Sequence, residues 1–164
     1  MFAQFNWNAS GYFRKLTETN LLARQSGMRF SLVSGLQGLE DAISTMQDSV
    51  GFVCLAESSD GVASIDISPN SRRVKTLFLA LRHAENDMPA REDALERIRE
   101  IFRQFLSHLL RERTRLHTQG IYLDPEIPFH EIESYFASGC ACAYFQISYS
   151  TAFDLRFDKS QWTE

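Results

Sequence analysis

The sequence has no long hydrophobic run. Its longest apolar stretches, such as residues 77–81, fall far short of the roughly 20 residues that a membrane-spanning helix needs. Residues 1–10 also lack the basic and then apolar order of a secretion signal. We therefore expect a cytoplasmic protein with no membrane partner. A chain of 164 residues with 44% hydrophobic content is long enough to form one globular domain, residues 1–164, around a buried core.

Cysteine is scarce, and its spacing argues against disulfides. Cys54, Cys140 and Cys142 make an odd number. Cys140 and Cys142 would be side-by-side neighbours on one strand, where they are poorly placed to bond each other. No second pair of cysteines or histidines stands at zinc-finger spacing. We therefore expect reduced thiols that are buried in the core.

Familiar reactive motifs are absent as well. The chain has no Gly-x-Ser-x-Gly turn for a nucleophile and no Gly-Lys-Ser or Gly-Lys-Thr element for phosphates, so it indicates no catalytic or cofactor-binding residue. Two loops do gather carboxylates and imidazoles, which could bind a metal. They hold His83, Glu85 and Asp87 in the first loop, and Asp124, Glu126, His130, Glu131 and Glu133 in the second. Because neither loop has a fixed ligand spacing, we expect ordinary charged loops and no metal.

Charge is distributed unevenly along the chain. The net charge of -4 combines -1 in residues 1–89, +2 in residues 90–117 and -5 in residues 118–164. Fourteen of the seventeen cations are arginine, whose planar guanidinium suits bidentate contacts with carboxylates and phosphates. An acidic chain is a poor general binder of nucleic acid. We therefore expect proteins, rather than nucleic acids, as partners of these charged surfaces.

The clearest positive signal is an alternation of apolar and other residues over residues 141–157. A period of two is typical of a strand with one buried face. The side chains predicted to share that face are Ala141, Ala143, Phe145, Ile147, Tyr149, Thr151, Phe153, Leu155 and Phe157. The sequence therefore predicts a strand of seventeen residues.

A long amphipathic helix is predicted to follow Asp87. Apolar residues recur there in alternating steps of three and four, which places them in one stripe on a helix. The stripe consists of Leu95, Ile98, Phe102, Phe105, Leu109 and Leu116. Asp87 is expected to cap the start, with Pro89 in the first turn, and Gly120 is expected to end the helix. We predict that this stripe packs against a sheet.

Weaker patterns give the remaining elements. A helix is predicted from Ser10 to about residue 25, with Phe13, Leu16 and either Leu21 or Leu22 on its inner side. Further expected elements are a strand at 29–33, a helix at 36–47, a hairpin of 52–57 with 62–67 through an Asp-Gly turn, a central strand at 74–82 and a strand at 121–123. Residues 132–136 are ambiguous, and Gly139 is expected to open the terminal strands.

These elements predict an α+β domain. Its antiparallel or mixed sheet would carry the long amphipathic helix and the shorter helices mainly on one face. In element order over residues 36–157, the chain resembles the tail-terminator, tail-completion and neck proteins of tailed bacteriophages, which set a helix against a small sheet with long hairpins. The resemblance implies a virion assembly role, in the cytoplasm or in the assembled virion. It carries over no functional residue, because these families offer no motif to match.

Two functions follow as hypotheses. The first is a non-enzymatic assembly protein of phage or prophage origin, which acts through protein interfaces and could form a homo-oligomeric ring. Its expected interface residues, chosen from the basic helix and the acidic region, are Arg103, Arg111, Arg115, Glu131 and Glu133. The alternative is a small enzyme or ligand-binding domain that uses the acidic loop around His130. A regulatory module that binds another protein is a third reading.

Overall fold

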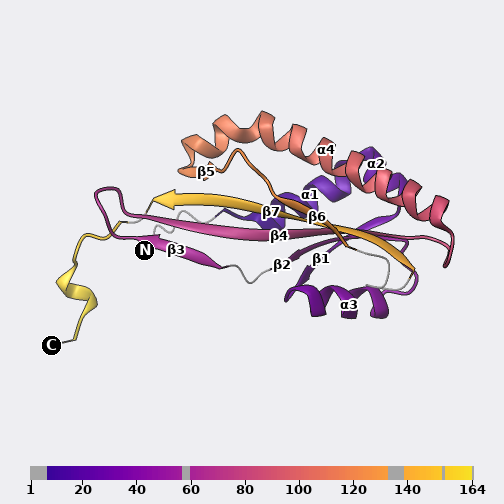
Figure 1. Cartoon of the computed structure of the whole chain (residues 1–164). Coiled ribbons are helices and arrows are strands. Elements are labelled where there is room, and N and C mark those ends of the chain that lie inside the picture. Colours follow the sequence, from indigo (N-terminus) through magenta and orange to yellow (C-terminus); the bar gives the residue numbers. More distant parts are fainter. Residues whose placement is uncertain (1–6, 57–59, 133–138, 153, 164) are drawn as a thin grey trace.

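The structure is a computed structural model that describes residues 7–56, 60–132, 139–152 and 154–163. It confirms the predicted α+β class, with a mixed sheet of seven strands and a long helix over one face (Figure 1). The helices are α1 (Ala9–Thr19), α2 (Leu21–Gln25), α3 (Leu36–Thr45) and α4 (Met88–Thr118), followed by a short 3-10 helix η1 (Lys159–Gln161). The strands are β1 (Met28–Val33), β2 (Gly51–Ala56), β3 (Gly61–Ser64), β4 (Asn70–Arg82), β5 (Ile121–Leu123), β6 (Phe129–Ile132) and β7 (Cys140–Ala152).

Two long antiparallel strands, β4 and β7, form the centre of the sheet. They pair over thirteen residues each, from Asn70 opposite Ala152 to Arg82 opposite Cys140. β2 and β3 lie one after the other along the free side of β4, and β1 adds to β2 in parallel. β5 and β6 likewise share the free side of β7. The end of the sheet where Ser64, Asn70 and Ala152 are in register is called the distal end below.

One face of the sheet, called the α4 face below, carries the main core. α1, α2 and α4 cover it, as Figure 1 shows. All six residues of the predicted helical stripe are buried there, and the Phe102 ring stacks on Phe145 of β7. Asp87 caps the start of α4 by accepting a hydrogen bond from Ala90 N at 2.9 Å, as predicted. The helix pattern alone was therefore sufficient to place α4 correctly.

The opposite face, called the α3 face below, is only partly covered. α3 packs there against strand residues near the non-distal end, among them Phe52, Phe78 and Cys142. Toward the distal end the same face bears the exposed Gln146 and Arg72. The helices are thus placed mainly on one face of the sheet, as predicted.

The predicted hairpin between residues 52–57 and 62–67 is wrong. β2 and β3 do not pair with each other; each pairs with β4, and the hairpin in this region is β3 with β4. All six residues of β2 are buried, which suits a strand between β1 and β4 rather than the arm of a local hairpin. The strand predicted at 74–82 is confirmed as central, although it begins at Asn70.

Two further boundaries differ from the prediction. The first helix is broken at Asn20, whose side chain accepts a hydrogen bond from Ala23 N and so caps a separate α2. Asn8, rather than Ser10, caps α1 through Gly11 N. β7 ends at Ala152, so the buried alternation stops at Thr151, and Leu155 and Phe157 are exposed instead of buried. Phe153 lies outside the described residues.

Candidate functional site

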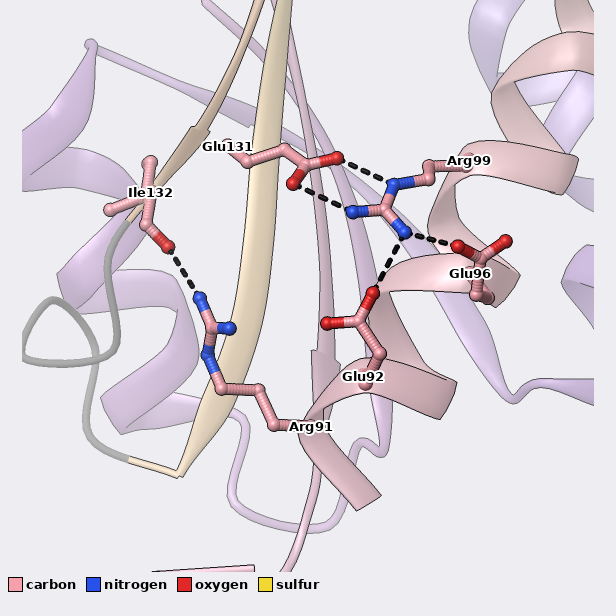
Figure 2. A network of polar contacts seen from close by, with 6 residues as sticks. All are labelled: Arg91, Glu92, Glu96, Arg99, Glu131 and Ile132. Carbon is pink, nitrogen blue, oxygen red and sulfur yellow. Dashed lines mark hydrogen bonds and ion pairs between the residues drawn. The ribbon is translucent and has the colours of Figure 1, made fainter. Parts of the chain in front are cut away.

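An ion-pair network joins the outer side of α4 to β6. Arg99 donates from Nε and Nη2 to the two carboxylate oxygens of Glu131 at 2.6 and 2.8 Å, and from Nη1 to Glu92 at 3.0 Å (Figure 2). The same Nη1 contacts Glu96. The hydrogen bonds from Arg99 hold the pKa of the Glu131 carboxyl below its ordinary value. This bidentate contact ties the short edge strand β6 to the helix.

Arg91, about two helical turns before Arg99, makes a second contact with β6. Its Nη2 donates to the Ile132 carbonyl at 3.3 Å, as Figure 2 shows. Glu131 and Ile132 are therefore both held by arginines of α4. The network therefore acts as a structural clamp between α4 and β6, while Glu92 and Glu96 on its outer side stay exposed.

The predicted interface residues do not form one cluster. Arg103 lies on α4 and pairs with Glu100 at 2.7 Å, and Arg115 pairs with Glu112 further along the helix. Arg111 is exposed, and no hydrogen bond or ion pair is described for it within the residues that the structure covers. Glu131 is paired with Arg99, whereas Glu133 lies outside the described residues. The three predicted arginines are thus exposed on α4, and none of them pairs with Glu131, the one predicted acid among the described residues.

The two acidic loops use their groups for separate structural purposes. In the first loop, Asp87 caps α4, while His83 Nδ1 lies 2.8 Å from the Ala84 carbonyl. In the second loop, Asp124 pairs with Arg72 at 2.5 Å, and the His130 ring packs against Tyr144. Over the described part of the chain, no group of three His, Cys, Asp or Glu side chains lies close enough to hold a metal ion.

The thiols are buried beneath α3. Cys54, Cys140 and Cys142 are all free and all belong to the core on the α3 face. Burial raises the pKa of the Cys54 thiol to about 12, and it also raises the pKa of Cys142. These side chains therefore serve as small core residues, as predicted.

A small surface pocket lies at the non-distal end of the sheet. It has a volume of about 430 Å³, and its polar lining includes Ser26, His83, Asp93 and Arg97. The acidic loop around His130 does not line it. A ligand-binding reading that relies on this loop therefore gains no support from the pocket.

Two sets of large apolar side chains, one around β3 and one beyond β7, lie open to solvent. On β3 and in the turn that follows, the exposed fractions are 67% for Val62, 85% for Ile65 and 97% for Ile67. Beyond β7, they are 51% for Leu155, 74% for Phe157 and 65% for Trp162. Sequence reasoning assigned most of these residues to paired strands, so it missed this surface. Exposed apolar surface of this kind often marks a site where another protein binds.

Comparison with known proteins adds no relationship. No protein-family model matches the chain, and a search of curated proteins finds no match. Within the described residues, no helix is both long and apolar enough to cross a membrane.

Proposed function

We propose that this chain is a non-enzymatic assembly protein that acts through protein–protein interfaces, and that it belongs to the virion assembly machinery of a phage or prophage. The observation that carries the proposal is the exposure of six large apolar side chains, three around β3 and three beyond β7, which together are called the distal group: Val62, Ile65, Ile67, Leu155, Phe157 and Trp162. Their exposure costs free energy in water that a contact with another protein would recover.

Part of the element order supports the phage setting. The resemblance to tail-terminator and neck proteins depended in part on a hairpin over residues 50–67, which the structure does not contain, whereas the long α4 helix over β4 and β7 agrees with the helix-on-sheet arrangement. Such proteins act as symmetric assemblies, and a head-to-tail contact between identical chains closes a ring when its rotation permits. We therefore propose self-association into a closed oligomer.

The exposed arginines of α4 add a second kind of contact. Arg103, Arg111 and Arg115 have exposed side chains on this helix. Exposed charges of this kind steer the encounter between proteins and select partners, whereas buried apolar contacts supply most of the affinity. The distal group would then hold the assembly together, and α4 would orient it.

The test is the mass of the intact chain in solution. Sedimentation velocity and light scattering over a wide concentration range should show an oligomer of defined mass, and negative-stain electron microscopy should show closed particles. Replacing Ile65 and Ile67 together with Glu should shift the oligomer toward monomer. The matched control is Leu21→Glu, because Leu21 is also exposed, at 71%, but lies on α2, which belongs to neither proposed contact. A wild-type chain that stays monomeric at every concentration would overturn the proposal.

The enzyme or ligand-binding reading around His130 remains the alternative. In the structure, Asp124 and Glu131 bind different arginines, Arg72 and Arg99. The acids of this loop are thus engaged separately, and no specific contact favours this alternative among the described residues.

A further inference from the structure

The alternation of apolar and polar residues that predicts a strand continues in the sequence beyond the end of β7. After β7 ends at Ala152, Leu155 and Phe157 keep the apolar positions, and Asp154, Arg156 and Asp158 keep the polar ones. Ala152 is also where the pairing with β4 ends, because its partner Asn70 is the first residue of β4. The segment after β7 therefore has the sequence of a strand at a place where its own sheet offers it no further partner.

We call residues 154–163 the C-terminal arm. The polar contacts described for its backbone lie inside the arm: Arg156 N donates to the Asp154 side chain, and Gln161 N donates to Asp158 O. Phe157 and Trp162 stack on each other with ring centroids 6.1 Å apart, and both remain exposed. Figure 1 shows the arm leaving the distal end of the sheet and running away from it. The arm thus presents its apolar side chains to solvent.

A strand edge to which the arm could add is present at the same end of the molecule. β3 pairs with β4 on one side only, and among the described residues no strand lies on its other side. Such an open edge presents unpaired backbone groups that another strand can bind. Val62 lies on this strand, and Ile65 and Ile67 directly follow it. The edge therefore offers both backbone hydrogen bonds and apolar side chains.

We propose that residues 154–158 of the C-terminal arm, which precede η1, add as a strand to the open edge of β3 in a second copy. This inference rests on the proposed self-association and names the contact that produces it. A second copy is the occupant because the described part of one chain carries both halves of the contact: a strand-like sequence after β7 and an edge of β3 on which no described strand lies. Strand addition of this type gains affinity from main-chain hydrogen bonds and specificity from alternate side chains.

Exposed apolar area is present on both halves of the contact. Aromatic side chains bury about 150–250 Å² each when they are fully covered, so Phe157 and Trp162 of the arm can contribute up to roughly 300–500 Å², to which the aliphatic side chains add. A stable interface buries about 800 Å² on each partner. Reciprocal exchange of arms would close a dimer, whereas a head-to-tail exchange would close a ring, and the measured mass distinguishes the two.

Disulfide trapping between two different copies tests the contact directly. One copy carries Ile65→Cys and the other, with a mass tag, carries Phe157→Cys; both positions are exposed, whereas the three native thiols are at most 2% exposed. Mild oxidation of the mixture should give a disulfide between the two kinds of copy. Replacing the first copy with Leu110→Cys supplies the control, since Leu110 is similarly accessible but lies away from β3. Unchanged thermal midpoints of both variants establish that they are folded.

A second measurement separates this inference from the proposed function. Leu155→Asp combined with Phe157→Asp should weaken self-association at least tenfold, while Leu21→Asp, at a 71% exposed position of α2, should leave it unchanged. An oligomer that survives the arm variant, with no trapped disulfide above the control, would overturn the arm contact and leave the assembly role standing. If a chain carrying both Ile65→Cys and Phe157→Cys forms its disulfide within a monomer, the arm binds its own edge and the inference is also overturned. A strictly monomeric wild type would overturn both proposals.

Discussion

The guanidinium of Arg99 on α4 donates hydrogen bonds to both carboxylate oxygens of Glu131 on β6, at 2.6 and 2.8 Å. This contact makes stability depend on pH. Because hydrogen bonding to Arg99 lowers the pKa of Glu131 in the folded chain, its contribution is fully present above the ordinary carboxyl pKa of about 4.3. The contribution is lost as the pH falls through the lowered pKa of the folded state, where Glu131 takes up a proton.

Glu131→Gln should therefore destabilise the chain near neutral pH by about 1 kcal/mol, the upper end for partly exposed pairs. Urea unfolding measured at several pH values checks this, and the difference from wild type should shrink in acid. The control is Glu126→Gln, because Glu126 is exposed in the same loop region. Equal losses for the two variants at neutral pH would show that the clamp contributes nothing specific.

Phe102 should be essential to the core. Its side chain is only 7% exposed and stacks on Phe145, so Phe102→Ala leaves a cavity between α4 and the sheet. The expected loss in the free energy of unfolding is about 3 to 5 kcal/mol. Leu110→Ala on the exposed side of the same helix should cost far less. Chemical denaturation measures both, and an unchanged midpoint for Phe102→Ala would contradict the assigned packing.

Charge reversal on α4 should weaken association. Arg111 and Arg115 are exposed and lie four residues apart, on one side of the helix. Arg111→Glu combined with Arg115→Glu should lower the oligomer mass without unfolding the chain. Added salt should act in the same direction in the wild type, because exposed charges are screened over about 10 Å at 0.1 M. The control is Arg97→Glu combined with Arg113→Glu, which reverses two charges elsewhere on α4. If light scattering gives the same loss of oligomer mass for both pairs of substitutions, a specific contact through Arg111 and Arg115 is ruled out.

The three thiols should be unreactive in the folded protein. Cys54, Cys140 and Cys142 are buried, and burial raises the pKa of each thiol, which keeps the thiolate population small. A disulfide reagent that releases a coloured thiol should titrate three groups after denaturation and react slowly with the native chain. Rapid reaction of one native thiol would mean that α3 opens readily from the sheet.

Metal removal should leave the protein unchanged. The carboxylates and imidazoles of the two acidic loops already serve as a helix cap, ion-pair partners and a ring contact, as with Asp87, Asp124 and His130. A chelator should therefore not change the thermal midpoint. Stoichiometric metal in the purified chain, lost together with its fold on chelation, would instead favour the alternative around His130.

Sequence reasoning succeeded where one element carries its own signal. The α4 stripe and its Asp87 cap depend on residues within a single helix, so periodicity was enough to predict them. The hairpin prediction failed because it relied on Asp60 and Gly61, which are only a local turn signal. The position of β2 depends on its pairing with β1 and β4, and the local sequence does not reveal that pairing. The length of β7 was overestimated for a similar reason: alternation at Leu155 and Phe157 describes a preference for strand structure but not the presence of a partner strand.

The candidate surfaces were harder to predict than the fold. The sequence showed that the region around α4 is basic and the later region acidic, yet it could not assign Glu131 to Arg99 rather than to Arg103, Arg111 or Arg115. That choice depends on how β6 crosses α4 in three dimensions. Exposure of Ile65 and Ile67 was also beyond the sequence pattern, because it follows from the position of a turn at the edge of the sheet.

The ladder between β4 and β7 also determines how the chain must fold. Its partners are 58 positions apart at Arg82 and Cys140 and 82 positions apart at Asn70 and Ala152, so no part of the central pairing is local. Closing such long loops costs entropy before any hydrogen bond of the ladder can compensate for it. We expect slow refolding, on the millisecond-to-second scale typical of chains dominated by distant contacts, with helix formation in α4 preceding the union of the two strands it connects.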